Sequence, residues 1–407
     1  METAIITSGY MPVPAALGGG VEALVEAIIQ QNASNGRLQL TVFSIYHSQA
    51  VQQAKTVKNC RFIFIKPPHI VKACDRILYL IAKWLLRKQK SMSYRYILQR
   101  LYYVSKVSRC LRDQPFDRVV LENHATLFLV LKKYGNARKY AGRYYYHLHN
   151  LVSNDYGCQA IMRQSRKVLG VSRYIDRSFS QFLGKFPENR LTVLRNCVDV
   201  ARFERSNHIQ EAMRWRQKCK IASGDQVILF TGRLSEEKGI KELLEAFSRL
   251  SLPRARLVIV GGYFYASSMV SAYEKRLHAV ARSLGNRVVF TGYVPHDQMP
   301  AVYAMADVSA IPSIWDDPAP LTIIESMASG LPIVTTDSGG ITEYVTPECA
   351  VILQRDSQLV EHLSEALTAL LSDPDRRKRM GEASRRQALS LNQFNYYTEF
   401  VEEIIKA

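Results

Sequence analysis

The feature that most constrains the fold is a repeated alternation of short apolar strands and amphipathic helices. In the first half of the chain the expected strands are Thr3–Ser8, Leu38–Ile45, Cys60–Ile65, Arg118–Leu121 and Arg143–His147. The alternation restarts after about residue 200, with strands at Val227–Thr231, Arg256–Val260, Val288–Thr291, Val308–Ile311 and Ile333–Thr335. Helices are expected between these strands, around residues 239–250, 270–284, 320–329 and 357–372. Because strands that alternate with helices form parallel sheets, the sequence predicts an α/β protein with two doubly wound, Rossmann-like domains.

The length of 407 residues suits two domains better than one, because a single hydrophobic core rarely grows beyond about 250–300 residues. We place an N-terminal domain at residues 1–200 and a C-terminal domain at residues 201–385, and we expect a helix at about residues 386–407 to pack back on the first domain. No apolar run approaches the ~20 residues that span a bilayer, and no basic leader precedes the first strand. We therefore expect neither a spanning helix nor a signal peptide.

Cysteine spacing and charge bear on the compartment and the partners. The seven cysteines include no C-x-x-C pair, which argues against a disulfide framework or a zinc site and favours a reducing cytosol. Residues 1–199 hold 30 Lys and Arg against 11 Asp and Glu, a net charge of +19, whereas residues 200–407 hold 24 against 25. Such an excess predicts a polyanionic partner, either a nucleic acid or an anionic membrane surface.

The basic excess is concentrated in residues 69–112, which carry 11 basic groups and the single acid Asp75. On a helical projection, the cations gather within a sector of about 60° and the apolar residues lie on the opposite side. The cations are Lys72, Arg76, Lys83, Arg87 and Lys90, and the apolar residues are Ile77, Ile81, Trp84 and Leu85. We expect membrane contact through Lys83, Arg87, Lys88 and Lys90. Alternatively, the basic face meets only water while the apolar stripe packs on the domain core.

The most specific motif follows the strand Val227–Thr231. Gly232 and Arg233 begin the turn, and Lys238 and Gly239 end it where the next helix begins. Doubly wound domains bind ligands at the carboxyl ends of their strands, and an Arg fork beside a Lys point charge suits a diphosphate. The alternative is a solvated loop with two ordinary cations.

A second turn at the same edge contains Asp317 and leads into a helix that begins near Pro320 and carries Glu325. The positive end of this helix would form an anion site that converges with Arg233 and Lys238. A carboxylate can accept hydrogen bonds from two vicinal hydroxyls, so Glu325 is a candidate for holding a ribose and Asp317 for holding another sugar. Otherwise Asp317 is a turn or N-cap acid, and Glu325 belongs to a solvated helix face.

Three glycines, Gly18, Gly19 and Gly20, follow the first strand and precede a helix. Glycines let backbone N–H groups approach an anion closely, although the same run also suits a tight turn with positive φ. No G-x-G-x-x-G motif follows a strand and no G-x-x-x-x-G-K-[ST] motif occurs, so neither a dinucleotide site nor a P-loop is indicated.

The run from Arg233 to Gly340 resembles the donor domain of retaining GT-B glycosyltransferases of glycosyltransferase family 4. The family pattern G-R-x-x-x-x-K-G matches residues 232–239, and E-A/S-M-A-x-G-x-P matches residues 325–332. The N-terminal glycine loop, His149-Asn150, residues 171–174 and residues 196–199 follow in the family's order. The resemblance implies a GT-B fold, in which two Rossmann-like domains face each other across a cleft. The donor would bind to the C-terminal domain and the acceptor to the N-terminal domain.

The resemblance also implies a set of site residues. The implied catalytic residues are His149, Arg233, Lys238 and Asp317. The implied donor-binding residues are Gly19, Gly20, Arg233, Lys238, Val294, Asp317, Ala319, Pro320, Leu321 and Glu325. We prefer His149 to His147, which lies two residues earlier and which we place on the opposite side of the strand. Glu122, Asn123 and His124, after another strand, are weaker candidates for holding the acceptor.

The implied reaction is the retaining transfer of a hexose or N-acetylhexosamine from a nucleotide diphosphate sugar, with a UDP-sugar preferred. The acceptor would be a lipid-linked saccharide or a polysaccharide of a bacterial capsule, O-antigen or lipopolysaccharide. Because cations can stabilise the leaving diphosphate, we expect no metal and no cofactor. We expect a cytoplasmic protein, peripheral on the anionic inner leaflet of the inner membrane.

Two alternatives stay open. One is a basic nucleic-acid-binding protein, although no recognition motif for nucleic acid is visible and we expect no such partner. The other is a catalytically inactive GT-B binding protein, against which the intact Arg233, Lys238 and Glu325 argue. Asp317 stands where the family usually has Glu, and Ala319-Pro320 replaces the usual Phe-Gly. These departures affect the identity of the sugar more than the chemistry.

Overall fold

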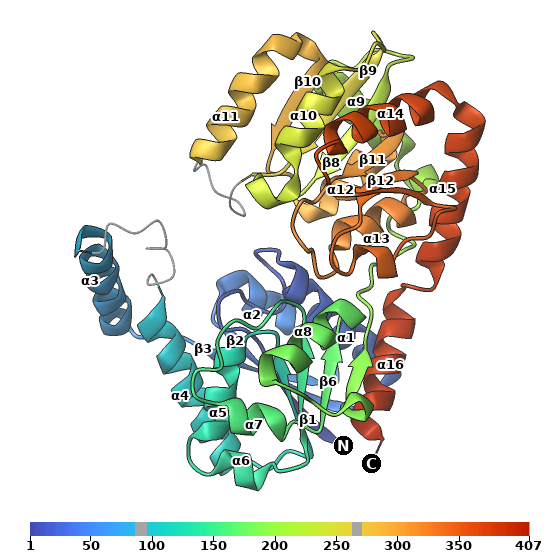
Figure 1. The fold of residues 1–407 in the computed structure, drawn as a ribbon. Helices are drawn as coiled ribbons and strands as arrows, with labels where there is room; N and C mark the ends of the chain where they lie inside the picture. The colour runs from blue at the N-terminus through green and yellow to red at the C-terminus, as the bar shows by residue number, and fades with distance from the viewer. Residues whose placement is uncertain (86–95, 263–270, 407) are drawn as a thin grey trace. The chain divides into compact units, whose positions relative to one another are not determined.

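The computed structural model describes residues 1–85, 96–262 and 271–406, and the chain divides into two compact units. Unit 1 comprises Met1–Val171, Ile175–Leu194 and Tyr397–Ala407, and unit 2 comprises Ser172–Tyr174 and Arg195–Tyr396. Each unit contains one parallel sheet with helices around it (Figure 1). The predicted fold class, two doubly wound α/β domains, is confirmed.

Unit 1 contains a seven-stranded sheet in the order β3-β2-β1-β4-β5-β6-β7. Its strands are β1 (Glu2–Ile6), β2 (Gln39–Ile45), β3 (Cys60–Ile65), β4 (Arg118–Glu122), β5 (Tyr144–Leu148), β6 (Lys167–Gly170) and β7 (Leu191–Val193). The helices in this part of the chain are α1 (Gly20–Asn35), α2 (Ser48–Ala54), α3 (His69–Leu85), α4 (Ile97–Asp113), α5 (Phe128–Lys132), α6 (Asn136–Lys139), α7 (Gln159–Arg163) and α8 (Arg173–Leu183).

Unit 2 contains a six-stranded sheet in the order β10-β9-β8-β11-β12-β13. Its strands are β8 (Gln226–Thr231), β9 (Ala255–Val260), β10 (Val288–Gly292), β11 (Val308–Ile311), β12 (Ile333–Thr336) and β13 (Ala350–Leu353). The helices in this part of the chain are α9 (Ile209–Lys218), α10 (Ile240–Ser248), α11 (Ala272–Ala281), α12 (Met299–Ala304), α13 (Leu321–Ala328), α14 (Leu359–Ser372), α15 (Pro374–Leu389) and α16 (Gln393–Ile405).

The strand order determines where ligands can bind. In each sheet the order in which strands are added reverses at one strand. In unit 1, β1 lies between β2 and β4, and in unit 2, β8 lies between β9 and β11. In open parallel sheets the crevice for ligands forms at this switch point, outside the carboxyl ends of the strands. A ligand site is therefore expected at the loops after β1 and β4 in unit 1, and at the loops after β8 and β11 in unit 2.

The two series of strands were predicted because their central strands are buried on both faces and form continuous apolar runs. Val227, Ile228 and Leu229 of β8, for example, are completely buried. The strands β6, β7 and β13 were not predicted. Each has only three or four residues, and none is buried along its whole length, unlike the equally short β11 and β12. A short run that is only partly buried carries too weak a pattern to be distinguished from a loop.

The C-terminal part of the chain differs in detail from the prediction. The helix expected at about 386–407 is two helices, α15 and α16, and unit 1 resumes only at Tyr397. The hydroxyl of Tyr397 donates a 2.7 Å hydrogen bond to Asn32 Oδ1, and Arg118 Nε donates a 3.0 Å bond to the carbonyl oxygen of Ile404. The first boundary lies between Leu194 and Arg195, whereas the sequence suggested residue 200.

The basic segment forms α3 and α4, with α3 standing off the body of unit 1 in Figure 1. Asp75 of α3 is buried, and its carboxylate accepts hydrogen bonds from the backbone N–H groups of Leu98 and Gln99 at 2.8 and 2.9 Å. It therefore caps the positive end of α4. No helix among the described residues is long and apolar enough to cross a membrane.

The apolar stripe of α3 does not pack on the core. Ile70, Ile77, Leu80 and Ile81 are between 51% and 77% exposed. The alternative that the apolar stripe packs on the domain core therefore does not hold for Ile77 and Ile81. The buried face of the helix is a different one, on which Asp75 and Ala82 lie. The side chains of Lys83, Trp84 and Leu85, and the residues Arg87, Lys88 and Lys90, lie outside what the structure describes.

Candidate active site

The basic turn after β8 lies at the switch point of unit 2. Gly232 has φ 151° and begins the turn, which then passes through a short 3-10 helix, η5 (Glu236–Lys238), and reaches α10. Arg233 is exposed, and its guanidinium lies 3.3 Å from the carboxylate of Glu237. An ion pair at an exposed position is weak, so the guanidinium can exchange this partner for an anionic ligand at little cost.

The acidic loop after β11 meets this turn directly. The ammonium group of Lys238 forms an ion pair with the carboxylate of Asp317. Asp317 is 6% exposed, and its backbone N–H lies 3.3 Å from the hydroxyl oxygen of Ser338. Burial on this scale means that the carboxylate is held in place, not merely solvated at the surface. The structure thus brings together two of the predicted site residues, Lys238 and Asp317, which are 79 positions apart in sequence.

Glycines make this close approach of loops possible. A Cβ atom on Gly239 would lie 1.9 Å from the carbonyl oxygen of Pro312, and one on Gly261 would lie 1.8 Å from the carbonyl oxygen of Gly232. Both distances are far inside van der Waals contact. The turn after β8 can therefore pack against the ends of β9 and β11 only because these positions lack side chains.

The start of α13 lies next to Asp317 in the same loop. Ala319 is buried, and its carbonyl oxygen accepts a 2.9 Å hydrogen bond from the side-chain amide of Asn196. Pro320 precedes the first helical residue, Leu321, and has no side chain that could cap the helix. The first N–H groups of α13 are therefore not occupied by a capping side chain, as an anion site at a helix N-terminus requires.

Glu325 of α13 is only 5% exposed, which excludes the alternative that it belongs to a solvated helix face. Its Oε2 accepts a 2.7 Å hydrogen bond from the hydroxyl of Tyr303, and its Oε1 accepts a 3.0 Å bond from Nε2 of His296. Burial, together with the charge of Glu325, raises the pKa of Tyr303 far above its ordinary value, so the phenol keeps its proton and donates. Thr231, the last residue of β8, lies 2.8 Å from the same hydroxyl.

His296 and Tyr303 were not predicted as members of this site. His296 follows β10 in the same loop as the buried Val294. The side chain of His296 is about half exposed. The rule that ligands bind at the carboxyl ends of strands, applied to β10, would have found His296. Tyr303 carries no such signal, since its position on α12 is that of an ordinary core residue.

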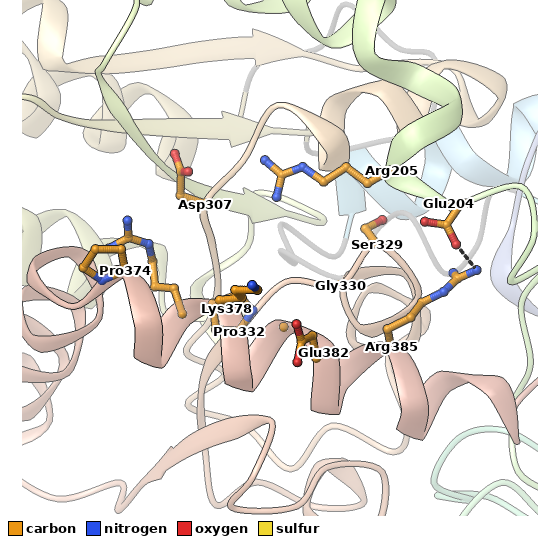
Figure 2. A pocket seen from close by; sticks show the side chains of 12 residues that line it. Glu204, Arg205, Asp307, Ser329, Gly330, Pro332, Pro374, Lys378, Glu382 and Arg385 are labelled. Carbon is orange, nitrogen blue, oxygen red and sulfur yellow. Dashed lines mark ion pairs between the residues drawn. The ribbon is translucent and has the colours of Figure 1, made fainter.

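A hollow of about 420 Å³ in unit 2 does not coincide with this site (Figure 2). Its lining includes Asp307 and Pro332, which immediately precede β11 and β12, so it opens at the amino ends of these strands. Several of its charged side chains already have structural partners. Arg385 pairs with Glu204 at 2.6 Å, and Asp307 accepts a 2.7 Å hydrogen bond from the backbone of Val227. We therefore do not assign the donor to this hollow.

In unit 1 the glycine loop after β1 forms a turn. Gly18 and Gly19 have φ of 79° and 106°, a region that favours glycine. A Cβ on Gly19 would lie 2.3 Å from Oε2 of Glu22, which is buried in the first turn of α1. Gly20 begins this helix. Burial raises the pKa of Glu22, while the hydroxyl of Ser8 hydrogen bonds to its carboxylate at 3.2 Å. The glycines therefore leave room for a carboxylate at the positive end of α1.

The ends of β4 and β5 bring two histidines close to one carboxylate. Nδ1 of His147 lies 2.9 Å, and Nε2 of His149 lies 3.4 Å, from Oε2 of Glu122. All three side chains are buried. The placement of His147 on the opposite side of the strand was wrong, because residues two apart in a strand point to the same face. The two rings lie 4.1 Å apart, centroid to centroid.

The two histidines keep Glu122 charged, and burial keeps His149 neutral. Burial alone would raise the pKa of Glu122, but the two histidines lower it to about 2. Burial also lowers the pKa of His149 to about 4. Glu122 is therefore a buried acceptor for the imidazoles. Its carboxylate has no exposed surface through which it could meet an acceptor substrate.

The other two acceptor candidates are partly exposed. Asn123, with φ 64°, accepts a 3.2 Å hydrogen bond from the backbone N–H of His149 on its Oδ1. His124 packs against Tyr10, with ring centroids 5.6 Å apart, and its Nδ1 lies 3.0 Å from the hydroxyl of Thr126. Both residues lie at the carboxyl edge of the unit 1 sheet, where a ligand of a doubly wound domain is expected.

Glu122, His147 and His149 are also the one group among the described residues whose ligand atoms lie close enough together to hold a metal ion, within 4.8 Å of one another. Two imidazoles and a carboxylate are a common donor set for zinc. In the present geometry, however, the carboxylate accepts hydrogen bonds from Nδ1 of His147 and Nε2 of His149, so the atoms that face one another are satisfied without a metal.

A pH dependence of stability follows from His149. Its pKa is lower in the folded chain than the ordinary 6.5, so the folded state binds fewer protons than the unfolded state between about pH 6.5 and 4. Stability should therefore be full above pH 6.5 and fall by roughly 2–3 kcal/mol as the pH drops to 4. Urea unfolding at pH 7 and pH 4.5 measures this loss. His149→Asn should reduce it, whereas His69→Asn, at an exposed position, should not.

Comparison with known proteins agrees with this architecture. Residues 212–387 match the family model described as glycosyl transferases group 1. Spore coat protein SA of Bacillus subtilis is 25% identical over 397 residues, which cover 96% of this chain and 95% of that protein. The lipopolysaccharide 1,2-N-acetylglucosaminetransferase of Salmonella typhimurium is 32% identical over 174 residues, 41% of this chain and 45% of that one.

A solved structure extends the likeness to both units. The crystal structure of Anabaena HepE in complex with UDP is 19% identical, covers 99% of both chains and superposes with a TM-score of 0.72. At this level of identity the likeness concerns the fold alone. Taken together, residues 212–387 of unit 2 are similar to glycosyl transferases group 1, and the chain has the GT-B fold of two Rossmann-like domains.

Proposed function

We propose that the protein is a retaining glycosyltransferase that moves a hexose or N-acetylhexosamine from a nucleotide diphosphate sugar to a saccharide acceptor. One observation carries the proposal. Two cations, Arg233 and Lys238, lie at the switch point of unit 2, and a buried carboxylate, Glu325, lies on the helix that begins at the same edge. Cations suit a diphosphate and a buried carboxylate suits the hydroxyls of a ribose, so one edge offers partners for both halves of the donor.

The chemistry asks for charge stabilisation at a defined place. When the bond between sugar and diphosphate breaks, negative charge develops on the diphosphate, and prepositioned cations stabilise it. Lys238 has three N–H donors, so it can keep Asp317 and still bind a phosphate oxygen. Arg233 can supply two parallel N–H groups, and the first turn of α13 supplies backbone N–H groups without a capping side chain.

Asp317 and His149 are proposed to act on the sugar. Asp317 forms an ion pair with Lys238, and its oxygens can also accept hydrogen bonds from donor hydroxyls. If His149 donates from Nε2 to Glu122, its Nδ1 carries the lone pair. That nitrogen is buried and has no hydrogen-bond partner among the described residues. We propose that it accepts a hydrogen bond from the reacting sugar, with Gly19 and Gly20 beside the donor.

The donor is proposed to be a UDP-sugar. The support is the solved neighbour HepE, which was crystallised with UDP. The acceptor is proposed to be a lipid-linked saccharide or polysaccharide of a bacterial surface glycan. Its support is the relative from Salmonella typhimurium, which is named as a lipopolysaccharide glycosyltransferase. The test is transfer from a panel of UDP- and GDP-sugars, with the anomeric configuration of the product read by NMR. An inverted product would contradict the retaining assignment.

We expect transfer to need no metal, because Arg233 and Lys238 supply the charge that a metal would otherwise supply. Dialysis against EDTA should leave the turnover within about twofold of the untreated protein. The measurement should include thermal unfolding, because the cluster of Glu122, His147 and His149 is where a metal could bind. A lower melting temperature with unchanged turnover would indicate a structural metal, whereas strict dependence of turnover on added Mg²⁺ or Mn²⁺ would contradict the proposal.

We further propose that the protein lies on the cytoplasmic face of the inner membrane, in contact with anionic lipid through α3. The support is the combination of exposed apolar and basic groups on one helix. Ile77 and Ile81 are exposed, the cations Lys72 and Arg76 of the same helix are exposed as well, and the single acid Asp75 is buried as a cap. The outer surface of the described part of α3 therefore carries positive charge and aliphatic side chains, the combination that inserts into a bilayer interface.

This proposal predicts the response of vesicle binding to two kinds of change. Ile77→Gln with Ile81→Gln should weaken sedimentation with anionic vesicles at least about tenfold, because two aliphatic side chains lose their burial in lipid. Lys72→Gln with Arg76→Gln should cost about 2 kcal/mol and reduce the salt sensitivity. Ile209→Gln, equally exposed but in unit 2, is the matched control. A wild-type protein that ignores anionic vesicles at low salt would contradict the membrane contact.

A further inference from the structure

Arg100, near the start of α4, is a charged side chain with no counter-charge in the part of the chain that the structure describes. It is only 5% exposed, although a free guanidinium strongly prefers water. Its Nε donates a 2.5 Å hydrogen bond to the hydroxyl oxygen of Thr126, and its guanidinium carbon lies 4.0 Å from the centre of the Tyr10 ring. Its two terminal nitrogens are buried without a hydrogen-bond partner in the described chain. Two of the three guanidinium nitrogens of Arg100 therefore donate no hydrogen bond within the described chain.

The groups around Arg100 supply no negative charge. The side chains that interact electrostatically with it are the phenols of Tyr10, Tyr103 and Tyr156, and no carboxylate of the described residues pairs with it. Removing one member of a buried ion pair leaves an uncompensated charge that is strongly destabilising. A buried arginine without a carboxylate among the described residues therefore points to a ligand as its partner.

The neighbouring histidine presents a further donor. The hydroxyl of Thr126 accepts from Arg100, so its own hydrogen is free to point to Nδ1 of His124, 3.0 Å away. The backbone N–H of Thr126 also points to Nδ1, at 3.3 Å. Nδ1 is thus an acceptor, and the ring hydrogen is on Nε2. Burial and the charge of Arg100 lower the pKa of His124 to about 4, so the ring is neutral. The cluster therefore offers donors and no acidic acceptor.

The cluster also lies where a substrate of unit 1 is expected. Tyr10 follows β1, and His124 and Thr126 follow β4, so they come from the two strands that flank the switch point. The start of α4 is anchored there by Tyr103, whose hydroxyl donates to the carbonyl oxygens of Thr7 and Phe43 at 3.2 and 2.8 Å. Arg100, one turn earlier on the same helix, is therefore fixed at the carboxyl edge of the sheet.

We propose that Arg100 and His124 bind a phosphate group carried by the acceptor substrate. A phosphate brings the missing negative charge and three acceptor oxygens, enough for the two idle guanidinium nitrogens and for the imidazole N–H. The inference rests on the proposed function, because it assigns unit 1 the acceptor, but it adds that the acceptor is anionic. Tyr10 is 46% exposed and covers the guanidinium, so its ring must move aside for the phosphate to reach Arg100.

The test separates this site from the donor cations. The full-length variant Arg233→Ala with Lys238→Ala removes the predicted diphosphate site of unit 2, and pyrophosphate and glucose 1-phosphate are titrated into it by calorimetry. We expect saturable binding that Arg100→Gln weakens at least about tenfold, because charge-assisted hydrogen bonds are lost. Arg100→Lys keeps the charge but loses the fork, and should fall between the two. Arg109→Gln, an exposed arginine on the same helix, should change nothing.

Other outcomes are equally informative. Unchanged binding in both Arg100 variants, or equal binding of glucuronate, overturns the phosphate site. If Arg100→Gln fails to fold, Arg100→Lys decides alone. If only glucose 1-phosphate shows Arg100-dependent binding, the phosphate belongs to a sugar. If only anionic vesicles show Arg100-dependent binding, the phosphate belongs to a lipid headgroup. If wild-type protein transfers no sugar while Arg100-dependent phosphate binding persists, the proposed function fails and the phosphate site stands.

Discussion

Replacing either Arg233 or Lys238 by alanine is expected to lower glycosyl transfer by at least about 100-fold. A prepositioned charge on a leaving group is worth about 3–4 kcal/mol, and both cations lie on the turn after β8. Arg233 is exposed, so its loss should leave stability nearly unchanged. Loss of Lys238 also leaves the buried Asp317 without its partner, so that variant should lose some stability in addition to its activity.

The measurement is steady-state transfer by purified variants, with far-ultraviolet circular dichroism and thermal unfolding as checks on the fold. Lys241→Ala provides the matched control, since this lysine is exposed on the adjoining helix α10 and pairs only with Glu245 in the described chain. It should keep wild-type turnover. Near-wild-type turnover in both Arg233→Ala and Lys238→Ala would show that the diphosphate is held elsewhere.

Gly239→Ala should be the most destabilising of the conservative changes at this edge. The new methyl group would lie 1.9 Å from the carbonyl oxygen of Pro312, and the residue has φ 67°, which side chains disfavour. Overlap with backbone cannot be relieved by turning a side chain, so we expect a loss of about 3 kcal/mol or more. Turnover should also fall, because the displaced turn carries Lys238 away from Asp317.

Gly292→Ala separates the two causes. Gly292 belongs to the same unit and has φ 69°, but a Cβ there meets no atom within 4 Å. Gly292→Ala should therefore lose only the stability that corresponds to backbone strain, about 1 kcal/mol. Urea unfolding of the two variants, compared with the wild type, measures the difference. Equal losses in both would mean that the contact between Gly239 and Pro312 contributes nothing.

The parts of the site that could be predicted are those that local sequence determines. A buried apolar strand followed by Gly232, Arg233, Lys238 and Gly239 specifies a strand, a turn and a helix within one short stretch of chain. The strand rule then places the two cations at the ligand edge. Pro320 and the apolar pattern after it locate the start of α13 in the same way.

What could not be predicted depends on contacts between distant residues. The burial of Glu325 results from Tyr303 and His296, which come from a different helix and a different loop. The exposure of Ile77 and Ile81 is of the same kind, because periodicity identifies an apolar stripe but not the surface that covers it. Arg100 looks like one cation among 11 in its segment until its burial is known.

The error on His147 was of another kind, since the information was present. Residues 147 and 149 are two apart at the end of a strand, and period-two alternation places them on the same face. Glu122, at the end of the neighbouring strand β4, pairs with His147 across the parallel ladder. The register of β4 and β5, which the sequence does not specify, is what turns these three residues into one cluster.

The most direct test of the nucleotide-sugar site is a calorimetric titration of UDP, GDP and their sugar conjugates into the wild-type protein and into the variant Arg233→Ala with Lys238→Ala. The account predicts saturable binding of at least one nucleotide diphosphate sugar, with UDP-sugars preferred, and a loss of at least about 100-fold in affinity in the double variant. Absence of binding by every nucleotide sugar, or equal binding by the double variant, would contradict the assignment of the donor to the turn after β8.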